Sequence, residues 1–208
     1  MSRFQTLDKV ALFDLGGHDM KYTDDTYYHV YNRGAHKRRI FFEDATYEYL
    51  IRLMTKYSTT YRTVIAAYCL MPNHYHLVVR QREEGSIGVF LKTTFNAFTQ
   101  AVNKRFGLSG TLFQGQAKVK EIDSDQYCVK VIRYVHTNPC KAGLVVKAED
   151  WPFSNYREWI GMGNGILMDV SLRDRCFGTP EEYKQFAQEA LLDDRSRDIG
   201  KYLFDENE

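Results

Sequence analysis

The chain of 208 residues is 44% hydrophobic and 14% aromatic, enough to bury one sizeable core, which excludes a disordered or low-complexity polymer. Its net charge of +1 combines a basic segment, residues 21–142 with 18 Lys and Arg against 10 Asp and Glu, and an acidic one, residues 143–208 with 8 against 14. The sequence has no run of 18 apolar residues and no CxxC pair. We therefore expect a soluble, cytoplasmic protein without a membrane span or a zinc ribbon.

Three strands and a helix are predicted in the first part of the chain. Residues 27–32 are aromatic and β-branched and predict a strand that stops at Asn32-Arg33-Gly34. From Asp44 to residue 57, apolar and aromatic positions recur at three and four residues, which indicates an amphipathic helix with Asp44 as its N-cap. Residues 63–70 and 74–80 predict two more strands, joined by a tight turn at Met71-Pro72-Asn73.

Further helices are predicted around a short fourth strand. An apolar stripe at helical spacing covers residues 86–105 and ends at two nearby glycines. Residues 118–122 predict the fourth strand, and Ser124 or Asp125 is expected to cap a helix that runs to Asn138-Pro139. A capping box with proline at its first helical position, Thr179-Pro180-Glu181-Glu182, predicts another helix near residues 180–191.

The predicted order β-α-β-β-α-β-α is that of an α+β protein with a ferredoxin-like, split βαβ antiparallel sheet. We expect helices on one face of this sheet, which leaves the other face free to hold a site. We expect the chain to consist of an N-terminal extension over residues 1–20, one main domain over 21–142, and a C-terminal extension over 143–208. That extension contains the helix near 180–191 and a charged, acidic tail.

Two histidines two positions apart form the first candidate site. His74 and His76 project from one face of their predicted strand, so their ring nitrogens can bind a single metal ion. Such a pair can equally be incidental on a half-exposed strand.

The second candidate pair lies on the third predicted helix. Tyr134 and Asn138 are four residues apart, so a phenol and an amide share one helix face, with His136 roughly opposite. Alternatively, Tyr134 is a packing residue and Asn138, before a proline, is a helix stop. If the pairs meet, two imidazoles and an amide oxygen could hold a divalent ion beside a tyrosine nucleophile. Tyr127 is the competing nucleophile, but four residues beyond it stands Val131, which cannot bind a metal.

Residues 71–79, which contain His74-Tyr75-His76, resemble the HUH segment of the IS200-like Y1 transposases, although the middle residue is usually bulky and apolar there. Residues 103–115, 133–139 and 151–156 resemble the branch of REP-associated tyrosine transposases. The resemblance implies an HUH nuclease fold, dependence on Mg²⁺ or Mn²⁺, a 5′-phosphotyrosine intermediate and hairpins of single-stranded repeat DNA as partner. By the matching motifs, His74, His76 and Asn138 would be metal ligands and Tyr134 the nucleophile. REP-associated relatives are thought to act as monomers and mobile relatives as dimers, so we expect a monomer while a homodimer stays open.

Basic residues near these motifs are candidates for binding the DNA backbone, and three aromatic residues for stacking on bases. The basic set is Arg33, Lys37, Arg38, Arg39, Arg80, Lys104, Arg105, Lys118, Lys120 and Arg133, and the aromatic set is Tyr31, Phe113 and Trp151. The same basic segment would suit a domesticated protein that binds repeat hairpins without cutting them. A third alternative is a metal-dependent hydrolase in which His74 and His76 activate water.

Overall fold

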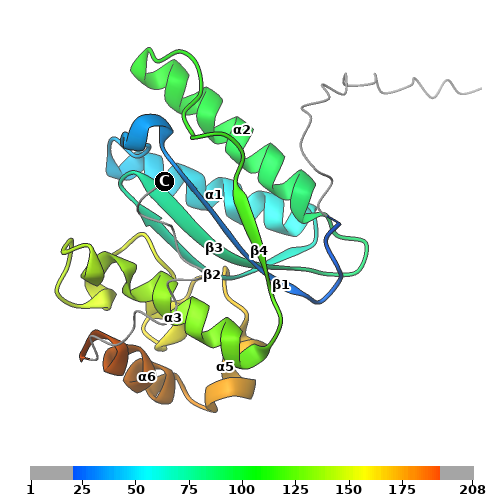
Figure 1. The fold of residues 1–208 in the computed structure, drawn as a ribbon, viewed down its shortest axis with the longest axis vertical. Helices are drawn as coiled ribbons and strands as arrows, with labels where there is room; N and C mark the ends of the chain where they lie inside the picture. Colours follow the sequence, from blue (N-terminus) through cyan, green and yellow to red (C-terminus); the bar gives the residue numbers. More distant parts are fainter. Residues whose placement is uncertain (1–20, 193–208) are drawn as a thin grey trace, which may run out of the picture.

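A four-stranded antiparallel sheet forms the centre of the computed structural model, which describes residues 21–192 (Figure 1). Its order is β2-β3-β1-β4, with β1 at Tyr27–Arg33, β2 at Thr63–Met71, β3 at His74–Gln81 and β4 at Lys118–Ile122. All three neighbouring pairs are antiparallel. This confirms the predicted strands and the α+β class. The predicted N-terminal extension and acidic tail, residues 1–20 and 193–208, lie outside the described residues.

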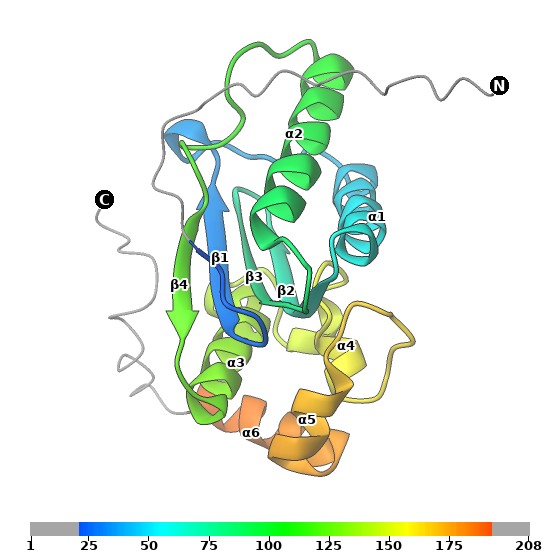
Figure 2. The same ribbon diagram turned by 90° about the vertical axis from the view of Figure 1, so that its right-hand side faces the viewer.

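Helices α1 (Asp44–Thr60) and α2 (Ile87–Phe106) cover one face of the sheet (Figure 2). Alternate strand residues face them and are buried, among them Val30, Leu77 and Val79. The Ser86 hydroxyl caps α2 by accepting from the backbone N–H of Val89. The N-cap of α1 is Glu43 rather than Asp44, and it caps without a side-chain hydrogen bond. The prediction of Asp44 as N-cap was therefore wrong by one residue, since Asp44 occupies the first helical turn.

The opposite face of the sheet is covered as well, so the prediction of a free face was wrong. Helix α3 (Asp125–Lys141) packs on β2 and β3, and the segments after it complete a second apolar core (Figure 2). Strand residues Tyr27 and Val78 join that core. The C-terminal elements are η2 (Ala148–Asp150), α4 (Tyr156–Trp159), α5 (Val170–Phe177) and α6 (Pro180–Leu192).

The chain after α3 is tied directly to the edge strand β2. Ser154 forms an isolated bridge with Cys69, and the backbone N–H of Leu70 donates to the Phe153 carbonyl at 2.9 Å. A β-bulge in β2 turns the Ala66 carbonyl outward from the ladder, where the indole N–H of Trp159 donates to it at 2.9 Å. Residues beyond the predicted main domain thus share a core with the sheet. Within residues 21–192, no helix has the length and apolar character that a membrane crossing requires.

Candidate active site

On the face of β3 that is turned toward α3, the first two residues are His74 and His76. The register places His76 beside Tyr31 of β1 and His74 beside Arg33. The two imidazole rings lie 5.2 Å apart between centroids and are nearly perpendicular. His76 has no exposed surface, whereas His74 is only partly buried. The tight turn before β3 therefore presents one imidazole near solvent and a second one beneath it.

Helix α3 brings Tyr134 and Asn138 onto these histidines. The ring of Tyr134 lies 5.4 Å from that of His76, edge to face, and the Asn138 side chain hydrogen-bonds to His74. The helix continues through Pro139 to Lys141, and the backbone N–H of Ala142 donates to the Asn138 carbonyl at 2.9 Å. The alternative of Asn138 as a helix stop is therefore wrong. Pro139 lacks the backbone donor that would bond to the carbonyl four residues earlier, and the helix nevertheless continues for two residues beyond it.

A third histidine, His29 on β1, stands behind His76 and was not singled out from the sequence. Its Nε2 lies 3.1 Å from Nδ1 of His76, and the two rings are stacked. Burial lowers the pKa of His29 to about 3, helped by the positive charge of Lys120, and lowers the pKa of His76 well below its ordinary value. Both rings are neutral near pH 7 and share one N–H in this contact. With that proton on Nδ1 of His76, its Nε2 carries the lone pair that a metal needs.

The protonation of His74 is set by its neighbour in the turn. Its Nδ1 lies 2.7 Å from the side-chain oxygen of Asn73, which can only accept, so Nδ1 carries the proton and Nε2 the lone pair. Burial lowers the pKa of His74 to about 4, although the hydrogen bond to Asn138 opposes this. The imidazole is thus neutral at pH 7, as metal binding requires.

A cavity of about 350 Å³ opens beside these groups. Its lining comes from β1, η1 (Ala35–Lys37), the β2–β3 turn and α3. The lining residues are Arg33, Lys37, Asn73, His74, Tyr134, Asn138, Lys141 and Ala142. Tyr127, the competing nucleophile, lies in the first turn of α3 and does not line the cavity. A phenol, a neutral imidazole, two amides and three cationic side chains therefore surround one space.

The predicted basic residues divide into two groups. Arg33 and Lys37 line the cavity, and Arg38 and Arg39 are exposed directly after Lys37. Two lysines of β4 are close to the site as well: Lys118 pairs with Tyr31 and Lys120 with His29, and the Lys120 ammonium lies 5.8 Å from the Tyr31 ring centroid. Two of these six cationic residues, Arg33 and Lys37, thus line the cavity, and the other four lie next to them in the chain or next to the site in the strand register.

The remaining four basic residues lie elsewhere. Lys104 and Arg105 are at the far end of α2, where Arg105 forms an ion pair with Glu43 at 2.6 Å. The Arg133 guanidinium packs over the ring of Phe186 in α6, 4.1 Å from its centroid. None of these three side chains lines the cavity, although Arg133 is close enough to Lys141 to lower the pKa of that lysine.

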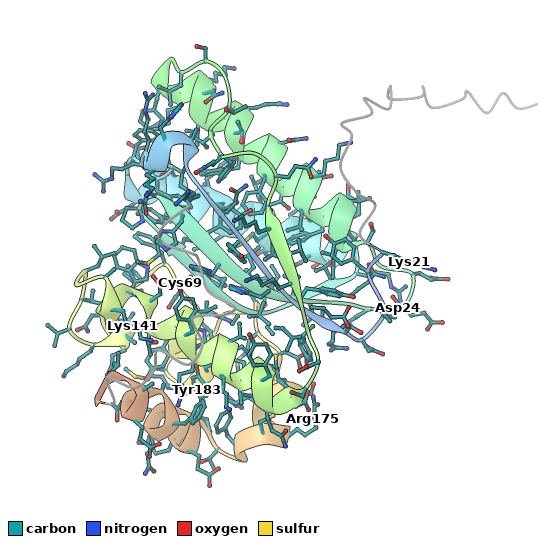
Figure 3. The ribbon with its side chains drawn as sticks, in the orientation of Figure 1. Lys21, Asp24, Cys69, Lys141, Arg175 and Tyr183 are labelled. Carbon is teal, nitrogen blue, oxygen red and sulfur yellow. The ribbon has the colours of Figure 1, made fainter. Side chains whose placement is uncertain are left out.

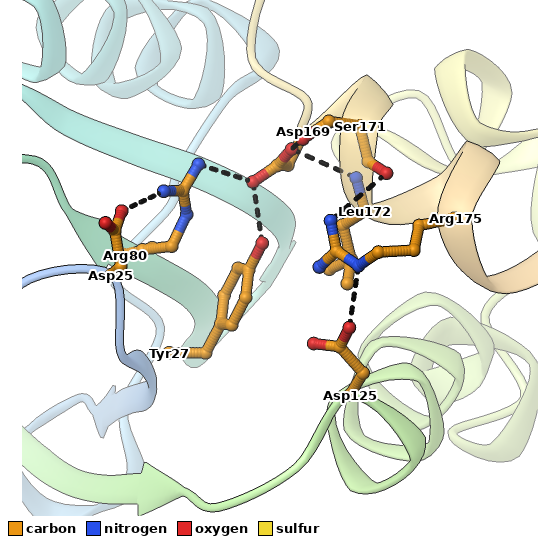
Figure 4. Close-up of polar contacts among 8 residues, drawn as sticks. All are labelled: Asp25, Tyr27, Arg80, Asp125, Asp169, Ser171, Leu172 and Arg175. Carbon is orange, nitrogen blue, oxygen red and sulfur yellow. Dashed lines mark hydrogen bonds and ion pairs between the residues drawn. The ribbon is translucent and has the colours of Figure 1, made fainter.

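Arg80 occupies the opposite end of β3 and pairs there with Asp25 and Asp169 (Figure 4). The Tyr27 hydroxyl donates to Asp169 at 2.7 Å in the same network. A larger cavity of about 520 Å³ lies nearby, but several carboxylates line it, Asp25 and Asp125 among them. Its charge disfavours a phosphate, so we place the candidate site at the smaller cavity.

The side chains of the three aromatic residues expected to stack on bases all contact other parts of the protein. Tyr31 is only 2% exposed, and Phe113 packs edge to face against Tyr75 and Phe95. The indole N–H of Trp151 donates to the Leu70 carbonyl at 3.1 Å. Tyr31 is therefore too deeply buried to stack on a base, whereas Phe113 and Trp151 are only partly buried and their stacking stays a prediction.

His136, between Tyr134 and Asn138 in sequence, points away from the cavity into the second core. Its Nε2 lies 2.9 Å from the side-chain oxygen of Asn155, and its Nδ1 lies 2.5 Å from the Tyr183 hydroxyl. The Asn155 amide nitrogen donates to the Ala66 and Leu167 carbonyls, so its oxygen must accept. His136 hence donates from Nε2 and accepts from Tyr183, a neutral form consistent with burial lowering its pKa to about 4.

Metal binding would depend on a mixed set of donors. Among the described residues, no cluster of three or more His, Cys, Asp or Glu side chains could hold a metal ion. Two imidazole nitrogens and one amide oxygen meet here instead, from His74, His76 and Asn138. Both rings are neutral, and the contact with Asn73 leaves the lone pair of His74 on Nε2. With the proton shared with His29 on Nδ1 of His76, the lone pair of His76 is on Nε2 as well, and the donor chemistry then fits a divalent cation.

The family model for IS200-like transposases matches residues 22–138, from before β1 to Asn138. A protein of Haemophilus influenzae named "Putative REP-associated tyrosine transposase" is 24% identical over 134 residues, which cover 56% of this chain and 76% of that protein.

A solved structure of a REP-associated tyrosine transposase bound to a REP hairpin has the same fold, with a TM-score of 0.56 at 17% identity. The likeness covers 76% of this chain and 96% of the other. Because the family model matches more than half of the residues, including every strand of the sheet and α3 up to Asn138, the chain belongs to the IS200-like transposase family.

Proposed function

We propose that this chain cleaves and rejoins single-stranded DNA through a 5′-phosphotyrosine on Tyr134. The observation that carries the proposal is the cavity in which Tyr134, His74 and Asn138 meet, with His76 in ring contact. Arg33 and Lys37 at the same cavity supply the positive charge that a DNA phosphate needs. The REP-associated tyrosine transposase that was solved with a bound REP hairpin has the same fold as this chain, which supports repeat hairpins as the substrate.

We propose His74, His76 and Asn138 as the residues that hold Mg²⁺ or Mn²⁺. When bound, the ion would withdraw charge from the scissile phosphate and so lower the barrier to attack on phosphorus. The two neutral imidazoles keep their lone pairs for this purpose, and His29 and Asn73 fix the orientation of the rings.

In the cleavage step, the Tyr134 oxygen attacks phosphorus and the bond from phosphorus to the 3′ oxygen breaks. The phenol loses its proton, the departing 3′ oxygen gains one, and the 5′ phosphate stays on Tyr134. In rejoining, a 3′ hydroxyl attacks the same phosphorus and releases the tyrosine. The energy of the broken backbone bond is retained in the phosphotyrosine, so the exchange consumes no nucleotide.

A single copy of the chain contributes every residue of this site. Tyr134 and Asn138 of α3 contact the histidines of the same chain, because α3 packs on its own β2 and β3. We therefore propose that the protein acts as a monomer with Tyr134 working in cis. Light scattering of the purified protein with and without hairpin DNA tests this, and a dimer that forms only with DNA would contradict it.

The proposed function is tested by incubating labelled hairpin DNA with the wild type and with Tyr134→Phe, with and without Mg²⁺ or Mn²⁺. Denaturing electrophoresis then reveals covalent attachment. We expect a metal-dependent adduct from the wild type, none from Tyr134→Phe, and a normal adduct from the control Tyr127→Phe. Binding of the hairpin without any adduct would favour a non-cleaving DNA-binding protein, and cleavage without an adduct would favour a hydrolase.

A further inference from the structure

Lys141 is the last residue of α3 and lines the same cavity as Tyr134. It stands seven residues after Tyr134 and three after Asn138, so the three side chains lie along one face of the helix. Its ammonium lies 5.5 Å from the centre of the Tyr134 ring. Figure 3 shows Lys141 at the C-terminal end of α3, where the helix meets the loop that follows it. The sequence prediction of DNA-binding residues did not include this lysine.

The charges around the cavity favour an anion next to Lys141. Arg33 comes from the end of β1, Lys37 from η1 and Lys141 from α3, so three separate elements direct a cation to one space. None of the described residues that line this cavity is Asp or Glu. Partial burial and the nearby Arg133 lower the pKa of Lys141, which means that the surrounding protein opposes its charge. A bound phosphate would offset that cost.

We propose that Lys141 is a catalytic residue that binds the scissile phosphate next to Tyr134 and stabilises the tyrosine oxygen when it departs. This inference rests on the proposed function. Cleavage puts negative charge on the phosphoryl oxygens in the transition state, where a fixed cation is most effective. Rejoining breaks the bond from phosphorus to the Tyr134 oxygen, which keeps the electron pair as a phenolate. Lys141 retains its proton in both directions, while the proton of the attacking 3′ hydroxyl finally returns to the phenol.

A purely structural role for Lys141 makes different predictions. A cation in the last turn of a helix stabilises the helix dipole, and its loss would lower stability slightly. It would not change the rate of the chemical step once DNA is bound and the protein is folded. The rate at saturating DNA therefore separates the two roles.

The test compares Lys141→Met with the wild type and with Lys130→Met, which removes the same charge from an exposed position of the same helix. Single-turnover adduct formation is measured at saturating hairpin DNA, and release of the tyrosine is measured by adding a 3′-hydroxyl strand to the isolated adduct. We expect both rates to fall about 100-fold in Lys141→Met. This is the loss that typically follows removal of one hydrogen-bond donor to negative charge that develops in the transition state. Lys141→Arg should recover most of both rates, and Lys130→Met should stay within about twofold of the wild type.

Wild-type rates in Lys141→Met, with the adduct present, would overturn this inference alone. A loss of hairpin affinity without a change in either rate would overturn it as well. Absence of an adduct from the wild type would overturn the proposed function and this inference with it. Lys141→Gln, which keeps a polar side chain of helical propensity, repeats the test if the methionine variant does not fold.

Discussion

Replacing His29 with leucine removes the imidazole that pairs with His76 and keeps the position filled with an apolar side chain. His29 is 2% exposed, and its Nε2 lies 3.1 Å from Nδ1 of His76. In the proposed metal site, His29 does not touch the ion. It holds the proton of His76 on Nδ1, which leaves the lone pair on the nitrogen that binds metal.

The expected loss follows from that contact. Removing a hydrogen-bond partner of a metal-binding histidine typically weakens metal affinity by about 10- to 100-fold, equivalent to about 1.4–2.7 kcal/mol. Leaving Nδ1 of His76 buried without its partner also destabilises the fold by about 1–3 kcal/mol. We therefore expect His29→Leu to bind Mn²⁺ at least tenfold more weakly and to remain folded at 25 °C.

Calorimetric titration with MnCl₂ measures the affinity, and a urea unfolding curve confirms that the variant is folded. The matched control is His36→Asn, which removes an exposed imidazole from η1 at a position of positive φ that asparagine tolerates. The control should bind Mn²⁺ like the wild type. If folded His29→Leu binds Mn²⁺ within twofold of the wild type, the role given to His29 is wrong.

Three other outcomes follow from contacts in the structure. The pKa of buried His136 is about 4 against an ordinary 6.5, so the unfolded chain binds more protons between these values. The stabilisation from His136 is complete above pH 6.5. Between pH 7 and pH 4.5, His136 should account for about 2–3 kcal/mol of the stability lost in urea titrations of the metal-free protein, and the lowered pKa values of buried His29 and His74 add to that loss. Equal stability at pH 7 and pH 4.5 would contradict a neutral His136. Tyr183→Phe removes the hydroxyl that donates to His136 and should cost about 1–3 kcal/mol at pH 7, so an unchanged urea midpoint would argue against this bond. Arg33→Met should lower the slope of log affinity for hairpin DNA against log salt by about 1, measured by fluorescence anisotropy, whereas Arg80→Met should leave that slope unchanged; the reverse result would move the DNA to the other end of the sheet.

Strands β1, β2 and β3 could be predicted from the sequence because nearly all of their residues are buried, which produces continuous runs rich in β-branched and aromatic side chains. Helix α2 was equally clear, since Ser86 supplies a cap at its start and Gly107, with φ of 63°, ends it in the left-handed conformation. The capping box of α6 is formed as predicted, with Thr179 and Glu182 exchanging hydrogen bonds of 3.3 Å. These features depend on neighbours within a few residues, which is why local pattern was sufficient.

Features that depend on distant partners could not be read in this way. Arg80 is of a residue type that often binds phosphate, but in the structure it pairs with Asp169, which lies 89 residues later in the chain. His29 is a single histidine in a strand, and only the register of β1 against β3 shows that it reaches His76. Lys141 was missed because the helix was expected to end at Pro139.

The buried contacts of His136 explain why residues after 143 matter to a site that they do not line. His136 lies between Tyr134 and Asn138 on α3, so whatever fixes its ring also fixes the helix that carries the proposed nucleophile. Asn155 and Tyr183, which hold that ring, both lie beyond the residues matched by the family model. Asn155 also donates to the Ala66 carbonyl and accepts from the backbone N–H of Tyr68, which ties α3 to β2. Since β2 is joined to β3 by the two-residue turn before His74, one hydrogen-bonded path connects the nucleophile helix to the strand of the proposed metal ligands. A change at Tyr183 should therefore affect the rate of adduct formation as well as stability, although this hydroxyl never meets DNA.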